Sequence, residues 1–327
     1  MTTDAHESSL PDGADALAAA IRAEVGKAFI GQEDVLDAVM IALLAGGHVL
    51  LEGVPGLGKT LLVRALSQAL GCAHARVQFT SDLMPSDISG HAVFDPKQER
   101  FEIRRGPVFT NLLLADEINR APAKTQSALL EAMQEQQVTI EGNSFPLPPP
   151  FMCLATQNPL ELEGTYPLPE AQLDRFLLKV LIGYPSLVDE KRMVAAVSEG
   201  RTAADFDLSQ VAQVADPAAV LMLQRRAAAV RVDAAVLDYA VRIVAATRAW
   251  PGIALGAGPR GSIALVRAAR AQAMLEGRDF VVPDDVRGIA KPALRHRIAL
   301  APELQIEGQS ADDVLHALLA KVDAPRQ

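Results

Sequence analysis

The chain has 327 residues, half of them hydrophobic but only 4% aromatic, so it is long enough for two domains with cores built mainly from Ala, Leu and Val. Its formal net charge of −9 and its pI of about 5.2 argue against a dedicated nucleic-acid binder, because such proteins usually carry a basic face. No signal peptide is visible, and the most apolar window, residues 35–51, is interrupted by Asp37, two glycines and His48. We therefore expect a cytoplasmic protein without a membrane span, in which the two lone cysteines, Cys72 and Cys153, fill the core.

The first half of the chain alternates between predicted helices and predicted strands. After a polar tail over residues 1–15, apolar periodicity predicts helices at 17–25 and 35–44, a buried strand at 48–52, a helix at 61–70 and a strand at 76–79. Residues 80–107 have an irregular pattern that contains a short β-hairpin, formed by 92–94 and 101–103. A strand at 112–117, a helix at 124–136, a second hairpin at 137–147, and strands at 151–156 and 177–182 follow. Strands separated by helices predict a parallel, doubly wound α/β sheet covered on both faces, with ligands at the carboxyl ends of the strands.

The second half of the chain is predicted to be helical. Gly183-Tyr184-Pro185 is the best candidate for a domain boundary, and the Ala-rich sequence beyond it has helix breaks near residues 216–217, 250–252, 258–259 and 282–283. The sequence therefore predicts a disordered tail over 1–15, an α/β core over 16–183 and a smaller all-α domain over 184–327.

One loop of the α/β core matches a phosphate-binding motif in full. Gly53-Val54-Pro55-Gly56-Leu57-Gly58-Lys59-Thr60 fits G-x-x-x-x-G-K-[ST] and lies between a predicted strand and a predicted helix. The glycines let successive N–H groups point into one concavity, and the helix adds its positive N-terminal end. We expect Lys59 to reach the outer phosphates of a nucleotide, with no structural partner other than phosphate, and the Thr60 hydroxyl to ligate Mg2+. An ordinary glycine-rich turn is the alternative, but the full motif in this context favours the phosphate site.

Polar side chains follow the next two strands. Asp116 and Glu117 end one of them: an Asp there typically holds Mg2+ through water, and a neighbouring Glu can activate the attacking water as a general base. The alternative is that the pair caps the next helix, but the phosphate loop favours catalysis. Asn158 ends the other strand and can contact the γ-phosphate, orient the water, or start a turn before Pro159.

Two arginines remain open on the residues alone. Arg175 precedes the fifth strand, and Arg260 opens a helix in the C-terminal region. Either could stabilise charge on a transferring phosphoryl group. Either could equally be a solvated surface residue, which is the default for Arg.

Six segments carry a resemblance to a known family: residues 29–33 (Phe-Ile-Gly-Gln-Glu), 53–60, 114–121 (Leu-Ala-Asp-Glu-Ile-Asn-Arg-Ala), 155–159 (Ala-Thr-Gln-Asn-Pro), 170–176 (Glu-Ala-Gln-Leu-Asp-Arg-Phe) and 258–261 (Gly-Pro-Arg-Gly). With these segments the chain resembles the AAA+ ATPases, most closely the MoxR type within the helix-2-insert branch. It runs from about residue 28 to the C-terminus. The phosphate loop is generic to NTPases, whereas the segments that contain Asp116, Asn158 and Arg175 are specific.

The resemblance implies roles that spacing does not show. Asn158 would be sensor 1, Arg175 the arginine finger and Arg260 sensor 2, while Ile30 and Gly31 would line the adenine pocket. The nucleotide-binding positions it implies are Ile30, Gly31, Gly53, Pro55, Gly56, Leu57, Gly58, Lys59, Thr60 and Leu61. Residues 258–261 depart slightly from the expected Ser-Pro-Arg-Ala form, but Arg260 is retained. In this branch the lid can be repositioned, so the resemblance leaves open whether Arg260 serves its own pocket or a neighbour's.

The resemblance also implies an architecture and a function. It implies a P-loop NTPase core with a helical lid over 184–327, a hexameric ring with ATP sites between subunits, and hydrolysis of ATP with Mg2+. Both hairpins would face the pore or the substrate. Such proteins act as chaperone-like remodellers that mature or activate other complexes, often with a partner that carries a von Willebrand factor A domain. The alternatives are a magnesium chelatase-like or DNA-acting motor, which salt-dependent DNA binding would indicate, and a nucleotide-dependent scaffold with little turnover, against which Glu117 argues.

Overall fold

A parallel five-stranded sheet forms the centre of the N-terminal half. The computed structural model describes residues 13–161, 164–198 and 208–325. The strands are β1 (Val49–Glu52), β2 (His74–Gln78), β5 (Leu112–Asp116), β8 (Met152–Gln157) and β9 (Leu178–Leu181), in the order β2-β5-β8-β1-β9. All four neighbouring pairs are parallel, which confirms the predicted doubly wound sheet. β2 and β9 are the edge strands.

Each central strand buries both of its faces. Leu51 and Leu154 belong to one hydrophobic cluster, whereas Leu50 and Cys153 belong to the other, because successive strand residues point to opposite sides. Helices α1 (Ala14–Ala28), α2 (Glu33–Leu44) and α3 (Lys59–Ala69) contribute to the first cluster, and α4 (Pro85–Ser89) and α5 (Ala123–Glu135) to the second. Both cysteines are free and buried, as expected, and burial raises the pKa of the Cys72 thiol to about 11.

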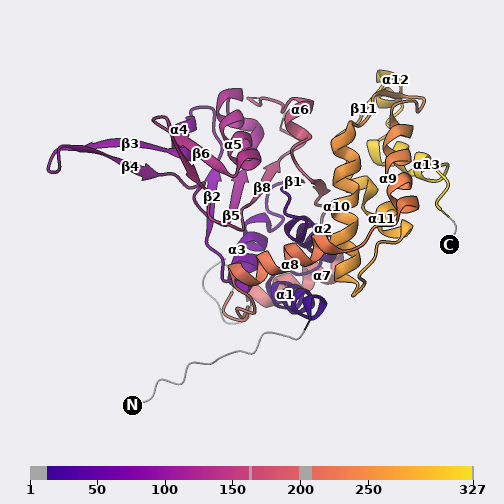
Figure 1. Cartoon of the computed structure of the whole chain (residues 1–327), viewed down its shortest axis with the longest axis horizontal. Coiled ribbons are helices and arrows are strands. Elements are labelled where there is room, and N and C mark those ends of the chain that lie inside the picture. The colour runs from indigo at the N-terminus through magenta and orange to yellow at the C-terminus, as the bar shows by residue number, and fades with distance from the viewer. Residues whose placement is uncertain (1–12, 162–163, 199–207, 326–327) are drawn as a thin grey trace, which may run out of the picture.

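Two hairpins and three short helices interrupt the βα pattern. The predicted hairpins are confirmed as β3 (Gly90–Asp95) with β4 (Arg100–Arg105), and β6 (Gln137–Ile140) with β7 (Asn143–Pro146). The β3–β4 hairpin extends far from the rest of the molecule (Figure 1). Short helices η1 (Ile118–Arg120) and α6 (Glu170–Leu173) precede α5 and β9, and α4 lies in the segment that was expected to be irregular. A five-residue helix is too short to show a hydrophobic period, so the pattern does not predict α4.

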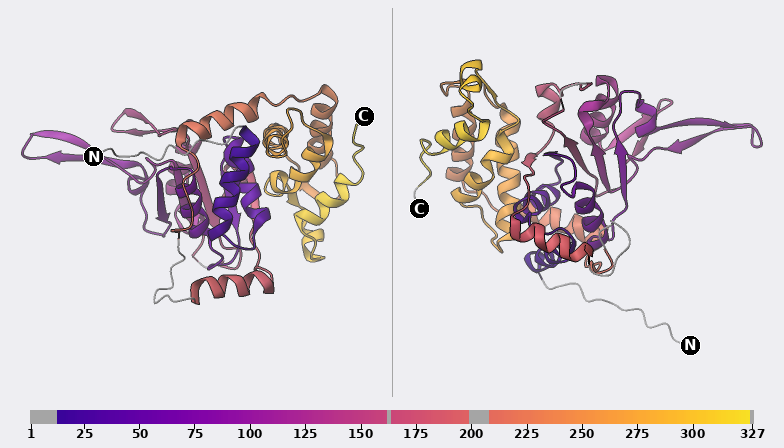
Figure 2. Two further views of the ribbon diagram at one scale, coloured as in Figure 1. Left: turned by 90° about the horizontal axis from the view of Figure 1, so that it is seen from below. Right: turned by 180° about the vertical axis from the view of Figure 1, so that it is seen from behind.

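The C-terminal half is mainly a helical bundle on the side of the core opposite to the β3–β4 hairpin (Figure 2). The elements of the C-terminal half are α7 (Leu187–Ser198), α8 (Pro217–Ala229), α9 (Ala234–Thr247), β10 (Ile253–Leu255), α10 (Pro259–Leu275), α11 (Pro283–Leu294), β11 (Ala299–Leu300), α12 (Pro302–Ile306) and α13 (Ala311–Leu319). The prediction of a purely helical domain is wrong at β10 and β11, which pair as a two-stranded antiparallel sheet. Strands this short carry no alternation that a sequence pattern could reveal.

The structure differs from the predicted domain boundaries at two places. Ala14 and Asp15 are helical, so the expected tail over 1–15 is too long at its end, and residues 1–12 lie outside the described part of the chain. Residues beyond the expected boundary near 184 return to the core: Gln68 on α3 donates hydrogen bonds to Leu208 O and Val211 O, and α8 packs against α2. Within the described residues, no helix is both long enough and apolar enough to cross a membrane.

Candidate active site

The phosphate-loop motif lies between β1 and α3, where its backbone lines a cavity of about 370 Å³. Gly56 and Gly58 have φ values of +85° and +78°, a left-handed conformation that side-chain-bearing residues adopt at a cost. Gly53 has a different reason to be glycine, because an added Cβ would lie 2.5 Å from the carbonyl oxygen of Ile182. Helix α3 begins at Lys59, two residues before the predicted start, since apolar periodicity does not register the polar Lys59-Thr60 pair.

Lys59 has a protein partner in this structure. Its Nζ donates a hydrogen bond of 2.6 Å to Gly53 O, so the expectation that it contacts only phosphate is wrong. Burial lowers the pKa of Lys59, and the negative charges of Asp116, Glu117 and Glu52 oppose that shift. A phosphate that entered the loop would replace one neutral acceptor with charged ones, which form stronger hydrogen bonds with an ammonium group.

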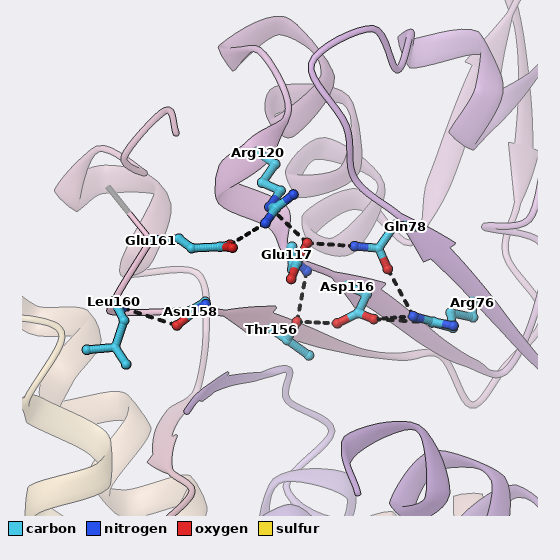
Figure 3. A network of polar contacts seen from close by, with 9 residues as sticks. All are labelled: Arg76, Gln78, Asp116, Glu117, Arg120, Thr156, Asn158, Leu160 and Glu161. Carbon is cyan, nitrogen blue, oxygen red and sulfur yellow. Dashed lines mark hydrogen bonds and ion pairs between the residues drawn. The ribbon is translucent and has the colours of Figure 1, made fainter. Parts of the chain in front are cut away.

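Asp116 has both carboxylate oxygens engaged (Figure 3). Oδ1 accepts a hydrogen bond of 2.6 Å from Thr156 Oγ1, and Oδ2 accepts one of 2.6 Å from Arg76 Nη2. The Arg76 side chain is half exposed and reaches Asp116 from the neighbouring strand β2. Asp116 and the Thr60 hydroxyl offer the hard oxygen atoms that Mg2+ prefers, at the wall of one cavity, so these residues fit the ion.

Glu117 has an unusual backbone conformation and two side-chain partners. Its φ of +56° is uncommon for a residue other than glycine and is often found where function fixes a side chain. Oε2 accepts from Gln78 Nε2 at 2.8 Å and pairs with Arg120 Nε at 2.9 Å, while the Glu117 N–H donates to Thr156 Oγ1 at 2.8 Å. Glu117 stands at the start of η1 but makes no side-chain capping hydrogen bond, which removes support from the helix-cap alternative.

Asn158 lies at the end of β8, lines the same cavity and is 7% exposed. Its Oδ1 accepts a hydrogen bond of 3.1 Å from the Leu160 N–H, so the turn-starting role predicted for it is present. This bond leaves the amide NH2 group as the part that can donate to a ligand.

Ile30 and Gly31 line a second cavity of about 260 Å³ and are not brought into the phosphate-loop cavity. Helix α7 stands between the two: Arg192 lines the second cavity and the adjacent Met193 the first. The α7 side chain of Asp189 lies so close to Gly31 that any Cβ at that position would collide with it. Sequence patterns gave no indication of this packing because it joins residues more than 150 positions apart.

Arg175 and Arg260 line a third cavity, of about 370 Å³, and neither lines the phosphate-loop cavity. Arg175 Nη1 donates a hydrogen bond of 2.8 Å to Leu130 O, and Arg260 Nη1 lies 3.9 Å from Asp174 Oδ2. The predicted site residues therefore separate into a phosphate-loop group and an arginine group.

The phosphate-loop cavity also contains polar residues that the sequence did not single out: Arg64, Arg76, Gln78 and Thr156. Arg76 and Gln78 are two positions apart on β2, which places both side chains on one face of the strand. Gln78 is in register with Asp116. Two polar residues in a predicted strand were the only sequence feature that pointed to these positions. Their place beside Asp116 becomes clear only from the order of the strands in the sheet.

Comparison with known proteins gives a consistent result over nearly the whole chain. Residues 48–178 match the model of the ATPase family associated with various cellular activities (AAA), and residues 245–318 match that of an AAA lid domain. The chain is 43% identical over 339 residues to Chaperone MoxR1 of Mycobacterium tuberculosis, covering 98% of this chain and 87% of that protein. It is 33% identical over 347 residues to Protein MoxR of Methylorubrum extorquens, covering 98% of each. A crystal structure of a candidate ATPase from Cytophaga hutchinsonii superimposes with a TM-score of 0.88 at 40% identity and covers 96% of both chains.

Proposed function

The chain belongs to the AAA ATPases and, within them, to the MoxR type, and from this we propose that it hydrolyses ATP to remodel client protein complexes. The similarity to a protein named as a chaperone supports remodelling as the purpose of the hydrolysis. We also propose a hexameric ring and a partner with a von Willebrand factor A domain, both on the strength of the MoxR resemblance. The proposed lid range, 184–327, includes residues 208–229, which pack on the core through Gln68 and α2.

In this proposal the phosphate-loop group binds the nucleotide. The backbone N–H groups of Gly56 and Gly58 and the Lys59 ammonium hold the phosphates at the N-terminus of α3. Pro55, Leu57 and Leu61 complete the loop and the first turn of the helix. For Ile30 and Gly31 to contact the base, as the resemblance implies, α7 would have to move from between the two cavities. Mg2+, held by Thr60 and Asp116, would neutralise charge on the outer phosphates.

Glu117 acts as the general base. Its Oε2 carries both of the contacts described for this carboxylate, so Oε1 is available to accept the proton of the attacking water. Thr156 fixes the backbone of Glu117 and the carboxylate of Asp116 with one hydroxyl. The Asn158 amide donates toward the γ-phosphate or the water.

A single observation supports a site shared between subunits: Arg175 and Arg260 line a cavity other than the one that holds Lys59, Asp116 and Glu117. Phosphoryl transfer benefits strongly from an arginine near the developing charge, whether that arginine comes from the same chain or from another. We propose that Arg175 and Arg260 of one subunit complete the phosphate-loop cavity of its neighbour. In this proposal Arg260 serves the pocket of the neighbouring subunit and not the pocket of its own chain.

Client contact is assigned to the β3–β4 hairpin. Phe94 and Phe101 are 50% and 72% exposed at its far end, and their rings meet edge to face with centroids 5.4 Å apart. Exposed aromatic pairs on a projecting element are unusual on a protein surface that binds nothing. The hairpin lies far from the lid, so a client could bind there without covering the arginine group (Figure 1).

The shared site is tested with mixed rings. Arg175→Ala should reduce turnover by roughly 10^3–10^5, the value of an arginine supplied in trans, and leave ATP binding intact. Rings co-assembled from Arg175→Ala and Glu117→Gln subunits carrying different tags contain pockets with an intact Glu117 and an intact neighbouring Arg175. Such rings, isolated through both tags, should recover part of the activity. Mixed rings as inactive as their parents would show that Arg175 does not act across an interface.

A further inference from the structure

Three consecutive residues that follow α11 contact the segment that carries Arg175. Arg295 Nη1 donates to Lys179 O at 3.2 Å, and His296 Nε2 lies 3.0 Å from Phe176 O. Because a carbonyl oxygen only accepts hydrogen bonds, Nε2 carries the proton in the His296 contact. Arg297 makes the largest set of these contacts, and its side chain is only 3% exposed.

Arg297 uses its complete set of hydrogen-bond donors. Nε donates to Asp174 Oδ1 at 2.7 Å, and Nη2 donates to Phe176 O at 2.7 Å and to Asp174 O at 3.2 Å. Nη1 donates to Leu177 O at 3.1 Å and to Ala293 O, near the end of α11. A guanidinium group has five N–H donors in a rigid plane, and all five have acceptors here. A lysine at this position would keep the charge but lose the planar fork.

Every partner of Arg297 outside the lid lies next to Arg175 in sequence. Asp174 precedes Arg175, and Phe176 and Leu177 follow it. The Asp174 carboxylate also faces Arg260, with 3.9 Å between Oδ2 and Nη1, so one side chain joins the lid arginine to the core loop. Asp174 is the only carboxylate among the described residues that line this cavity, whereas four arginines line it (Arg175, Arg260, Arg267 and Arg297). The cavity therefore presents positive charge, which suits the phosphates of a nucleotide.

Attachment of the lid does not by itself explain this arrangement. Arg267 on α10 already links the lid to the core through Ala45 O and Gly46 O, and α11 packs along β9. The additional bonds of Arg297 converge on three residues around the proposed arginine finger. A rigid connection there fixes the distance between an arginine on the core and one on the lid, which would otherwise vary with lid movement.

We infer that Arg297 is a positioning residue that holds Arg175 and Arg260 as one rigid unit for the neighbouring subunit's nucleotide. The inference rests on the shared site proposed above. It requires that a change at Arg297 impair the nucleotide pocket of the neighbouring subunit and leave the phosphate-loop cavity of its own subunit intact.

The test uses Arg297→Lys in the full-length protein. Its own turnover should fall by about 10^2-fold, the cost of a displacement of roughly 1 Å in a catalytic group, while ATP affinity stays unchanged. Mixed rings of Arg297→Lys and Glu117→Gln subunits should recover activity, since the Glu117→Gln subunit supplies an undisturbed arginine group. Arg278→Lys is the matched control: Arg278 pairs with the buried Asp285 inside the lid, away from the arginine group, and its variant should keep normal turnover.

The outcomes separate this inference from the proposal it rests on. Recovery with Arg175→Ala but not with Arg297→Lys would leave the shared site standing and overturn the positioning role. No recovery with either variant would overturn both. An equal loss of turnover in Arg278→Lys would show that general weakening of the lid accounts for the effect, and would also overturn the inference. If the Arg297→Lys protein melts at the assay temperature, the Asp174→Asn variant is used instead. This variant keeps the backbone carbonyls that accept from Arg297 and removes only the carboxylate charge that joins Arg297 to Arg260. Mixed rings of Asp174→Asn and Glu117→Gln subunits should recover activity in the same way, and the same outcomes would overturn the inference.

Discussion

Replacing Thr156 with Val removes one hydroxyl that holds the carboxylate of Asp116 and the backbone of Glu117 in the candidate active site. Oγ1 donates to Asp116 Oδ1 at 2.6 Å and accepts from the Glu117 N–H at 2.8 Å. The residue is 1% exposed, so bulk water is not available to take over either hydrogen bond. Valine has nearly the same shape as threonine, and the packing around the position should therefore survive.

The size of the effect follows from these two bonds. A hydrogen bond to a charged group contributes about 1.5–3 kcal/mol, and leaving a buried N–H without an acceptor costs about 1–3 kcal/mol. The melting temperature should therefore fall by several degrees, since about 1 kcal/mol shifts it by roughly 2–4 °C in a chain of 150–250 residues and less in a longer one. Turnover should also fall, because a displacement of Glu117 by roughly 1 Å would lower kcat by about 10^2-fold.

The assay compares phosphate release, nucleotide affinity and thermal melting in Thr156→Val and Thr156→Ser. Serine keeps the hydroxyl and loses only the methyl group, so it should retain most of the turnover. ATP affinity should be similar in both variants, because the phosphate loop and Lys59 are untouched. A wild-type kcat in Thr156→Val would refute the reasoning, and a loss in Thr156→Ser as large as that in Thr156→Val would show that the hydroxyl alone does not account for the effect.

Three further predictions concern the phosphate loop, the base and the pH dependence. Lys59→Ala should abolish ATP binding and, since it loses the hydrogen bond of a charged group to Gly53 O, lower stability by about 1.5–3 kcal/mol; unchanged affinity in a nucleotide titration would contradict the phosphate-loop assignment. Glu117→Gln keeps an oxygen that can accept from Gln78, so it should bind ATP yet hydrolyse it about 10^2–10^4-fold more slowly, and near-normal turnover would remove Glu117 from the base role. Burial lowers the pKa of His48 to about 4 from 6.5, so below pH 6.5 the unfolded chain binds a proton that the folded chain does not. Stability should therefore fall as the pH drops from 6.5 towards about 4, by at most about 1.4 kcal/mol per pH unit from this group, and urea unfolding that gives the same stability at about pH 7.5 and about pH 5.5 would contradict it.

The sequence predicts those parts of the site that are local in the chain. The phosphate loop is one continuous motif between a strand and a helix, and Asp116 and Glu117 follow a single hydrophobic strand, so each can be located from its neighbours. Arg76 and Gln78 are different, because their partners on β5 lie about 40 positions away and meet them only through the strand order β2-β5. A pattern that predicts a strand does not say which strand will be its neighbour, so both side-chain partners of Asp116, Arg76 on β2 and Thr156 on β8, were out of reach.

The position of Arg260 depends on the orientation of the lid, which no local pattern determines. If the lid covered the phosphate loop of its own chain, Arg260 would line that cavity and would be available to the nucleotide there. In this structure Arg297 is buried at the junction of lid and core, and its bonds to Asp174, Phe176 and Leu177 depend on the present orientation. Separating a buried guanidinium from its carboxylate partner costs about 3–5 kcal/mol, a penalty comparable with the differences that normally decide between two conformations of a protein. Lid movement that carried Arg260 to its own phosphate loop would incur this penalty. A neighbouring subunit that approaches the exposed Arg260 and the half-buried Arg175 in their present positions would not, and the energetics therefore favour a role for Arg260 in the neighbour's pocket.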